Sequence, residues 1–123
     1  MKTYLSINAE VVKALQPIIP VAHLEYPDGG REYATFDITV TRGVNHASGM
    51  NHGVLCYGYL DVFTDYDPTG SCSILEEIDR ALDQAGFSVQ SISGTRYFRE
   101  MHKYHTQISY QALVDIGGEE NGG

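Results

Sequence analysis

The sequence predicts one α+β domain, with an antiparallel or mixed sheet of about four strands and two helices packed on one face. Three observations support this fold class. The chain has 123 residues, enough to bury one hydrophobic core. Two segments repeat apolar residues at helical spacing, and others alternate apolar and polar residues as strands do. We expect residues 1–116 to form the domain and residues 117–123 to be a disordered, acidic, glycine-rich tail.

The first helix is expected over residues 5–15. Ser6 or Asn8 is the candidate N-cap, and Pro17 and Pro20 end the helix because proline cannot continue its hydrogen-bond ladder. Four apolar residues are predicted to share its buried face: Leu5, Ala9, Val12 and Leu15.

Extended segments follow this helix. Residues 21–26 are expected to be a short extended piece, closed by a turn at residues 27–30. Residues 33–41 alternate cleanly and predict a half-buried strand, and residues 42–53 have the composition of a long hairpin loop. The next strand, residues 54–64, is apolar on both faces, which suits a central strand or one whose outer face meets a partner.

A second amphipathic helix begins at Ser73. Glu76, three residues on, forms a capping-box pattern with it. Gly86 is the expected left-handed terminator, and Phe87 is expected to fold back over the last turn. The apolar stripe comprises Ile74, Leu75, Ile78, Leu82 and Ala85.

The last expected elements are strands. Residues 88–93 are a candidate short strand, and residues 104–116 are expected to form the long closing strand. Alternate residues of the closing strand point one way: Thr106, Ile108, Tyr110, Ala112, Val114 and Ile116.

Composition excludes several functions. Sixteen acidic residues outnumber eight basic ones, giving a net charge of −8, so binding of nucleic acid or of an anionic membrane is not expected. We see no apolar run long enough to span a membrane and no secretory signal at the N-terminus. The two cysteines, Cys56 and Cys72, are too few to stabilise a small secreted fold by disulfide bonds. A soluble protein with reduced thiols is therefore expected in a reducing cytoplasm.

One segment resembles a calcium-binding loop. Its candidate oxygen ligands are Asp65, Asp67, Thr69 and Glu76. A strand rather than a helix enters this loop, Pro68 lies inside it, and Glu76 is already the capping-box partner of Ser73. We therefore interpret the segment as a strand-to-helix turn and expect no bound metal.

No other constellation predicts an active site. The pairs His46 with His52 and His102 with His105 have no neighbouring cysteine, so surface positions are the preferred interpretation. Residues 70–73 lack the trailing glycine and linked base of a nucleophile elbow. We expect a protein that is not an enzyme and that uses no cofactor.

Tyrosines are frequent on or near the strands: Tyr57, Tyr59, Tyr97, Tyr104 and Tyr110. A tyrosine combines a large apolar body with a polar tip, so it suits sheet surfaces as well as interfaces. Packing on the sheet is the preferred interpretation. The apolar central strand and the long loop before it nevertheless supply interface candidates, namely Arg42, Asn45, His46, Met50, Asn51, His52, Tyr57 and Tyr59.

The order of these elements over residues 11–116 resembles the tail-completion (tail-terminator) proteins of long-tailed bacteriophages and prophages. Three segments carry the resemblance: the strand 59–63, the helix 78–87 ending in Leu-x-x-x-Gly-Phe, and the closing strand, which begins with Tyr104 and His105. The details of the loop 43–53 depart from that pattern, and the acidic tail has no counterpart in it.

The resemblance implies a structural virion protein without enzyme activity. It implies a homo-oligomeric ring, generally a hexamer, that caps the tail tube and joins it to the head connector. The partners would be the major tail tube protein and the connector or neck proteins, and DNA would pass the acidic channel without specific binding. Such a protein is made in the bacterial host cytoplasm and located in the tail or neck of the virion. A neck connector component, a small calcium-stabilised binding module and a hydrolase with an unrecognised site are the alternatives.

Overall fold

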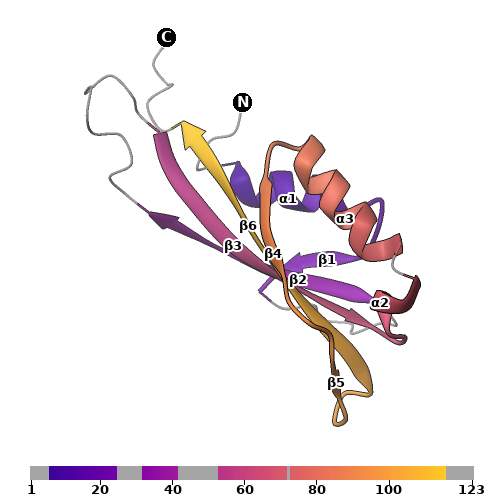
Figure 1. Cartoon of the computed structure of the whole chain (residues 1–123). Coiled ribbons are helices and arrows are strands. Elements are labelled where there is room, and N and C mark those ends of the chain that lie inside the picture. Colours follow the sequence, from indigo (N-terminus) through magenta and orange to yellow (C-terminus); the bar gives the residue numbers. More distant parts are fainter. Residues whose placement is uncertain (1–5, 25–31, 42–52, 72, 116–123) are drawn as a thin grey trace.

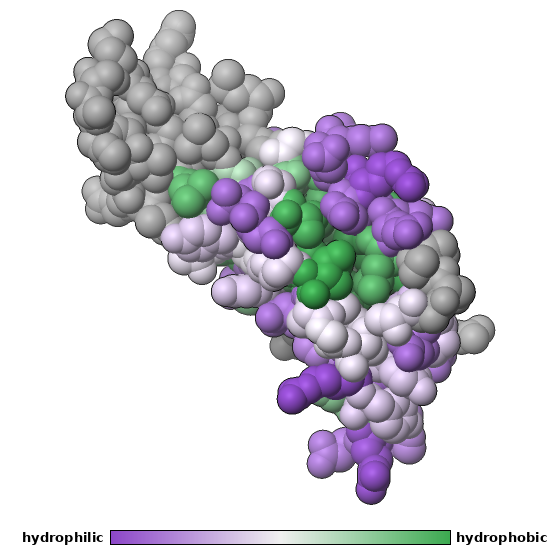
Figure 2. All heavy atoms as spheres, viewed as in Figure 1, coloured by the Kyte–Doolittle hydropathy of each residue, from purple (hydrophilic) through white to green (hydrophobic). Residues whose placement is uncertain are grey.

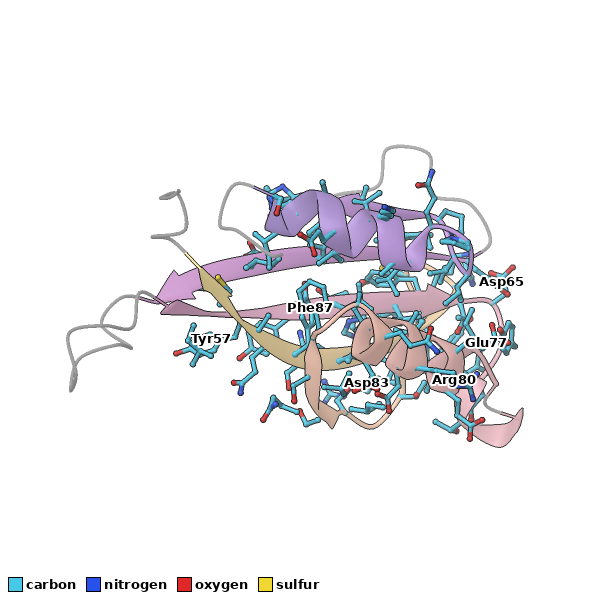
Figure 3. The ribbon with its side chains drawn as sticks, turned by 90° about the horizontal axis from the view of Figure 1, so that it is seen from above. Tyr57, Asp65, Glu77, Arg80, Asp83 and Phe87 are labelled. Carbon is cyan, nitrogen blue, oxygen red and sulfur yellow. The ribbon has the colours of Figure 1, made fainter. Side chains whose placement is uncertain are left out.

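The structure, a computed structural model, describes residues 6–24, 32–41, 53–71 and 73–115 of the chain. It is an α+β fold in which α1 and α3 lie side by side over one face of a sheet (Figures 1 and 3). The elements are, in order, α1 (Ile7–Leu15), β1 (Val21–His23), β2 (Tyr33–Thr41), β3 (Gly53–Thr64), α2 (Pro68–Ser71), α3 (Ser73–Gln84), β4 (Ser88–Ile92), β5 (Arg96–Phe98) and β6 (Lys103–Asp115).

The sheet has six strands, not about four. Its order is β1-β2-β3-β6-β4, and β5 also pairs with β6. The sheet is mixed, because β1 runs parallel to β2 while every other pairing is antiparallel. Both β1 and β5 have only three residues, which is too short for an alternating pattern, and β5 lies in a segment predicted to be a connection.

The core lies between the helices and the even-numbered residues of the central strands. In the register of β3 and β6, Leu60 faces Ile108 and Cys56 faces Ala112, and all four side chains are buried. Antiparallel pairing places such opposite residues on the same face, so both strands present one continuous apolar surface to the helices. The alternation predicted for residues 106–112 is therefore confirmed.

Helix α1 uses a different face from the one predicted. Its buried residues are Ile7, Val11 and Leu15, whereas Ala9 is exposed. Ser6 occupies the N-cap position, but its hydroxyl donates to Oε2 of Glu10 at 2.9 Å and makes no hydrogen bond to the helix backbone. The spacing of Ile7, Val11 and Leu15 is also helical, so the period predicted the helix but not its rotation.

Helix α3 buries the predicted residues Ile74, Leu75, Ile78 and Leu82. Gly86 terminates it with a φ of 92°, and its amide donates to the carbonyl of Asp83 at 3.0 Å. The amide of Phe87 donates to the carbonyl of Leu82 at 2.8 Å, and these two bonds form a Schellman motif. This motif folds the buried Phe87 under the helix and aims the chain into β4.

Several sequence predictions lie outside the described residues. These are the turn at 27–30, almost all of the loop 42–53 and the tail 117–123. The predicted capping box also lies outside the described part of the structure, because the side chain of Ser73 is not described. None of the helices in the described ranges is long and apolar enough to cross a membrane.

Candidate interaction surface on the helix-free face of the sheet

The sheet has a second face that α1 and α3 do not cover, and we name it the helix-free face. It is formed by the odd-numbered residues of β2, β3 and β6, because side chains alternate between the faces of a sheet. Its central members come from β3: Tyr57, Tyr59, Asp61 and Phe63. The neighbours of Tyr57 and Tyr59 across the strands are polar: Thr39, Asp37, Ser109 and Gln111.

Two of the predicted interface candidates meet on this face. Tyr57 is 40% exposed and Tyr59 is 54% exposed, and both point away from the helices because they alternate with buried Cys56, Gly58 and Leu60. They lie on a central strand that is paired on both sides, so their positions are rigid. The other six candidates lie outside the described residues: Arg42, Asn45, His46, Met50, Asn51 and His52.

An aromatic row crosses the same face toward the end of β3. The ring of Tyr33 stacks on Phe63 at 5.0 Å between centroids, and Phe63 contacts the ring of His105 at 4.9 Å. Phe98 of β5 extends the row, because its ring centroid lies 5.0 Å from that of His105. No local sequence pattern indicates this row, and the position expected for His105 from the sequence was on the surface. The four residues come from four strands, and only the pairing register brings them together.

Asp61 connects β3 to β6 through side chains. His105 Nε2 donates to Oδ1 of Asp61 at 2.8 Å, and the side-chain amide of Gln107 donates to the same oxygen at 3.1 Å. The side chains are partly withdrawn from water, with 17% of His105 and 31% of Asp61 exposed. A carboxylate that accepts two donors is well satisfied, so this cluster is suited to holding the strands together.

The candidate calcium ligands do not converge. The ammonium group of Lys103 forms an ion pair with Asp65, at the end of the sheet remote from Tyr57 (Figure 3). Oδ1 of Asp67 accepts hydrogen bonds from the amide nitrogen of Thr69 at 3.0 Å and from its hydroxyl at 2.6 Å. These two bonds lower the pKa of Asp67. The carboxylate of Asp65 is therefore occupied by Lys103 of β6, and the carboxylate of Asp67 is occupied by Thr69 at the start of α2.

Other candidate ligands and nucleophiles are scattered. Glu76 lies in the first turn of α3, and His102 lies in the turn between β5 and β6, with Nδ1 3.5 Å from the hydroxyl of Tyr97. Burial raises the pKa of the Cys56 thiol, which disfavours the nucleophilic thiolate. Among the described residues, no three His, Cys, Asp or Glu side chains form a group that could hold a metal ion.

The chain was compared with known proteins. No protein-family model matches it, and no curated protein sequence matches it.

Proposed function

We propose that this protein is a structural assembly protein of a bacteriophage virion. In this proposal it completes the tail tube as a subunit of a homo-oligomeric ring and joins the tube to the head connector. The observation that carries the proposal is the exposure of Tyr57 and Tyr59 on the central strand of the helix-free face. The sequence resemblance to tail-completion proteins supplies the biological setting.

The chemistry of the helix-free face supports protein contact. Tyrosine is enriched at protein interfaces because it buries a large area at a small cost in conformational entropy. Tyr57 and Tyr59 are flanked by the shorter side chains of Thr39 and Ser109, so their rings can be reached by a partner surface. The surface is built on paired strands, which limits the entropy lost on binding.

Charge supports the same role. A net charge of −8 gives each subunit of a ring a negative field, and a ring of such subunits would repel the phosphates of DNA. In this proposal DNA therefore passes the channel without specific binding. Glu77, which projects from the exposed side of α3, shows one location of this charge (Figure 3).

Deletion of the gene from its phage tests this proposal. We expect separate heads and tails whose tubes have irregular lengths, and restoration of joined virions when the wild-type gene is supplied from a plasmid. Electron microscopy of virions with a tagged subunit should place a ring at the top of the tail tube. A ring confined to the neck above the tube would assign the protein to the connector instead, and normal virions after deletion would contradict both roles.

A further inference from the structure

The hairpin formed by β5 and β6 extends beyond the part of the sheet that the helices cover (Figure 1). Its turn is closed by two backbone hydrogen bonds, from Met101 to Phe98 at 3.1 Å and from His102 to Arg99 at 3.2 Å. The rings of Tyr97 and Tyr104 contact each other across the two strands at 4.9 Å. The hairpin is thus an ordered arm, and little entropy would be lost if it bound a partner.

This arm exposes apolar and cationic groups together. Tyr97 is 50% exposed and Met101 is 41% exposed, which is high for large apolar side chains. Arg96 and Arg99 are also exposed. Residues 96–103 hold three of the eight basic residues of the chain, and the only acidic residue among them is Glu100. Lys103 is paired with Asp65, so Arg96 and Arg99 give the arm its positive charge, offset in part by Glu100, on a strongly acidic protein.

A shallow depression of opposite charge lies along the exposed side of α3. It is lined by Glu76, Asp79, Arg80 and Asp83, and we name it the α3 groove. The flank of α3 that faces α1 is a different one, lined by Ala81, Gln84 and Ala85. Three carboxylates and one guanidinium make the α3 groove net negative.

Apolar surface borders the helix on the side of the sheet edge. Figure 2 shows apolar residues open to solvent between the polar outer side of α3 and β4. Ile92 of β4 pairs with buried Ile108 and so belongs to the helix-covered face, yet it is 42% exposed. An acidic groove beside an uncovered apolar strip fits a partner that offers arginines together with aromatic or methionine side chains.

The arm projects away from α3 of its own molecule, outward from the part of the sheet that the helices cover (Figure 1). We propose that the β5–β6 hairpin of one copy docks in the α3 groove of a second copy. This inference rests on the self-association of the proposed function and names the two surfaces that make it. A contact between two different patches is head-to-tail, and copies joined in this way close into a ring when the rotation permits.

Charge reversal at single positions tests the contact. Arg99→Glu on the arm and Asp79→Lys in the α3 groove should each weaken self-association roughly tenfold or more, as measured by sedimentation velocity, since like charges would then face each other. Lys13→Glu and Glu77→Lys are matched controls: each makes the same change in net charge at an exposed helix position outside the groove. Both controls should assemble as the wild type does. Circular dichroism checks that every variant is folded.

Mixing the two weakened variants is the decisive measurement. The carboxylate introduced on the arm of one variant would face the ammonium group introduced in the α3 groove of the other, while the remaining contacts in an alternating ring keep the wild-type charges. We expect an equimolar mixture of Arg99→Glu and Asp79→Lys to recover assembly. Failure to recover, or assembly of either variant alone at wild-type affinity, would overturn the inference while leaving the proposed ring intact. A wild-type chain that is monomeric in solution and in virions would overturn both.

Discussion

The ring of Tyr110 on β6 lies directly over Gly58 on β3, and the two residues are partners in the antiparallel register. A Cβ added at Gly58 would be 2.9 Å from Cζ and from the hydroxyl oxygen of Tyr110. Phe87 packs edge-on against the same ring, 5.5 Å away at 85°. The missing side chain of Gly58 therefore makes room for an aromatic pair that joins the sheet to the end of α3.

The substitution Gly58→Ala should destabilise the fold. The new Cβ would also lie 2.3 Å from the carbonyl oxygen of Asp37, and backbone on a paired strand cannot yield cheaply. We expect a loss of about 1–3 kcal/mol or more in the free energy of unfolding, measured by urea denaturation. Gly94→Ala is the control, because no atom lies within 4 Å of its added Cβ. Equal stability of the two variants would contradict this account.

The substitution Tyr110→Phe should leave the fold as stable as the wild type or more so. The hydroxyl of Tyr110 is buried, and no hydrogen-bond partner for it is found in the described part of the chain. A buried unsatisfied hydroxyl costs free energy, about 1–3 kcal/mol in mutational series, and the substitution removes that cost. Thermal and urea denaturation would measure the change. A clear loss of stability would mean that the hydroxyl is satisfied in the folded protein.

Alkaline pH should weaken the folded state through the same residue. Burial and, to a lesser extent, the negative charge of Asp37 raise the pKa of Tyr110 above its ordinary value of 10.0. The unfolded chain loses this proton near pH 10 while the folded chain keeps it, so the stabilisation is complete below pH 10 and is lost as pH rises further. Urea denaturation between about pH 8 and about pH 11 should show a smaller decline for Tyr110→Phe than for the wild type. Equal declines would contradict the prediction.

Asp61 should matter as an acceptor more than as a charge. In Asp61→Ala, the donors of His105 and Gln107 lose their shared acceptor, and we expect a loss of about 1–2 kcal/mol in the free energy of unfolding. In Asp61→Asn an amide oxygen can still accept, so the loss should be smaller. Chemical denaturation of both variants at neutral pH gives the comparison. A larger loss for the asparagine variant would show that the charge of the carboxylate dominates.

Tyr57 and Tyr59 should be needed for assembly and not for folding. Because 40% and 54% of these residues are exposed, the double change Tyr57→Ala and Tyr59→Ala should alter the melting temperature little. Attachment to tail tubes, measured by co-sedimentation, should be lost. Tyr66→Ala is the matched control, since Tyr66 is 41% exposed but lies between β3 and α2, outside the helix-free face and the β5–β6 hairpin, and this variant should bind tubes as the wild type does. Tube binding by the double variant at the wild-type level would contradict a role for this face.

Local sequence patterns were sufficient for the elements that have a strong period. The spacing of Ile74, Ile78 and Leu82 predicted α3, and Gly86 marked its end, because helix capping depends on neighbouring residues alone. Alternation predicted β2 and β6, and the apolar run at residues 54–64 predicted β3, each within a residue or two of the observed limits.

Long-range packing decides what those elements meet. The pairing of Asp61 with His105 joins residues 44 positions apart, and the contact of Tyr110 with Gly58 depends on the same register between β3 and β6. Distant partners also determine three other features: the three-residue strands β1 and β5, the face that α1 buries, and the aromatic row. Local periodicity sets which face a side chain takes, but register is set by summed long-range packing, which no short window of sequence contains.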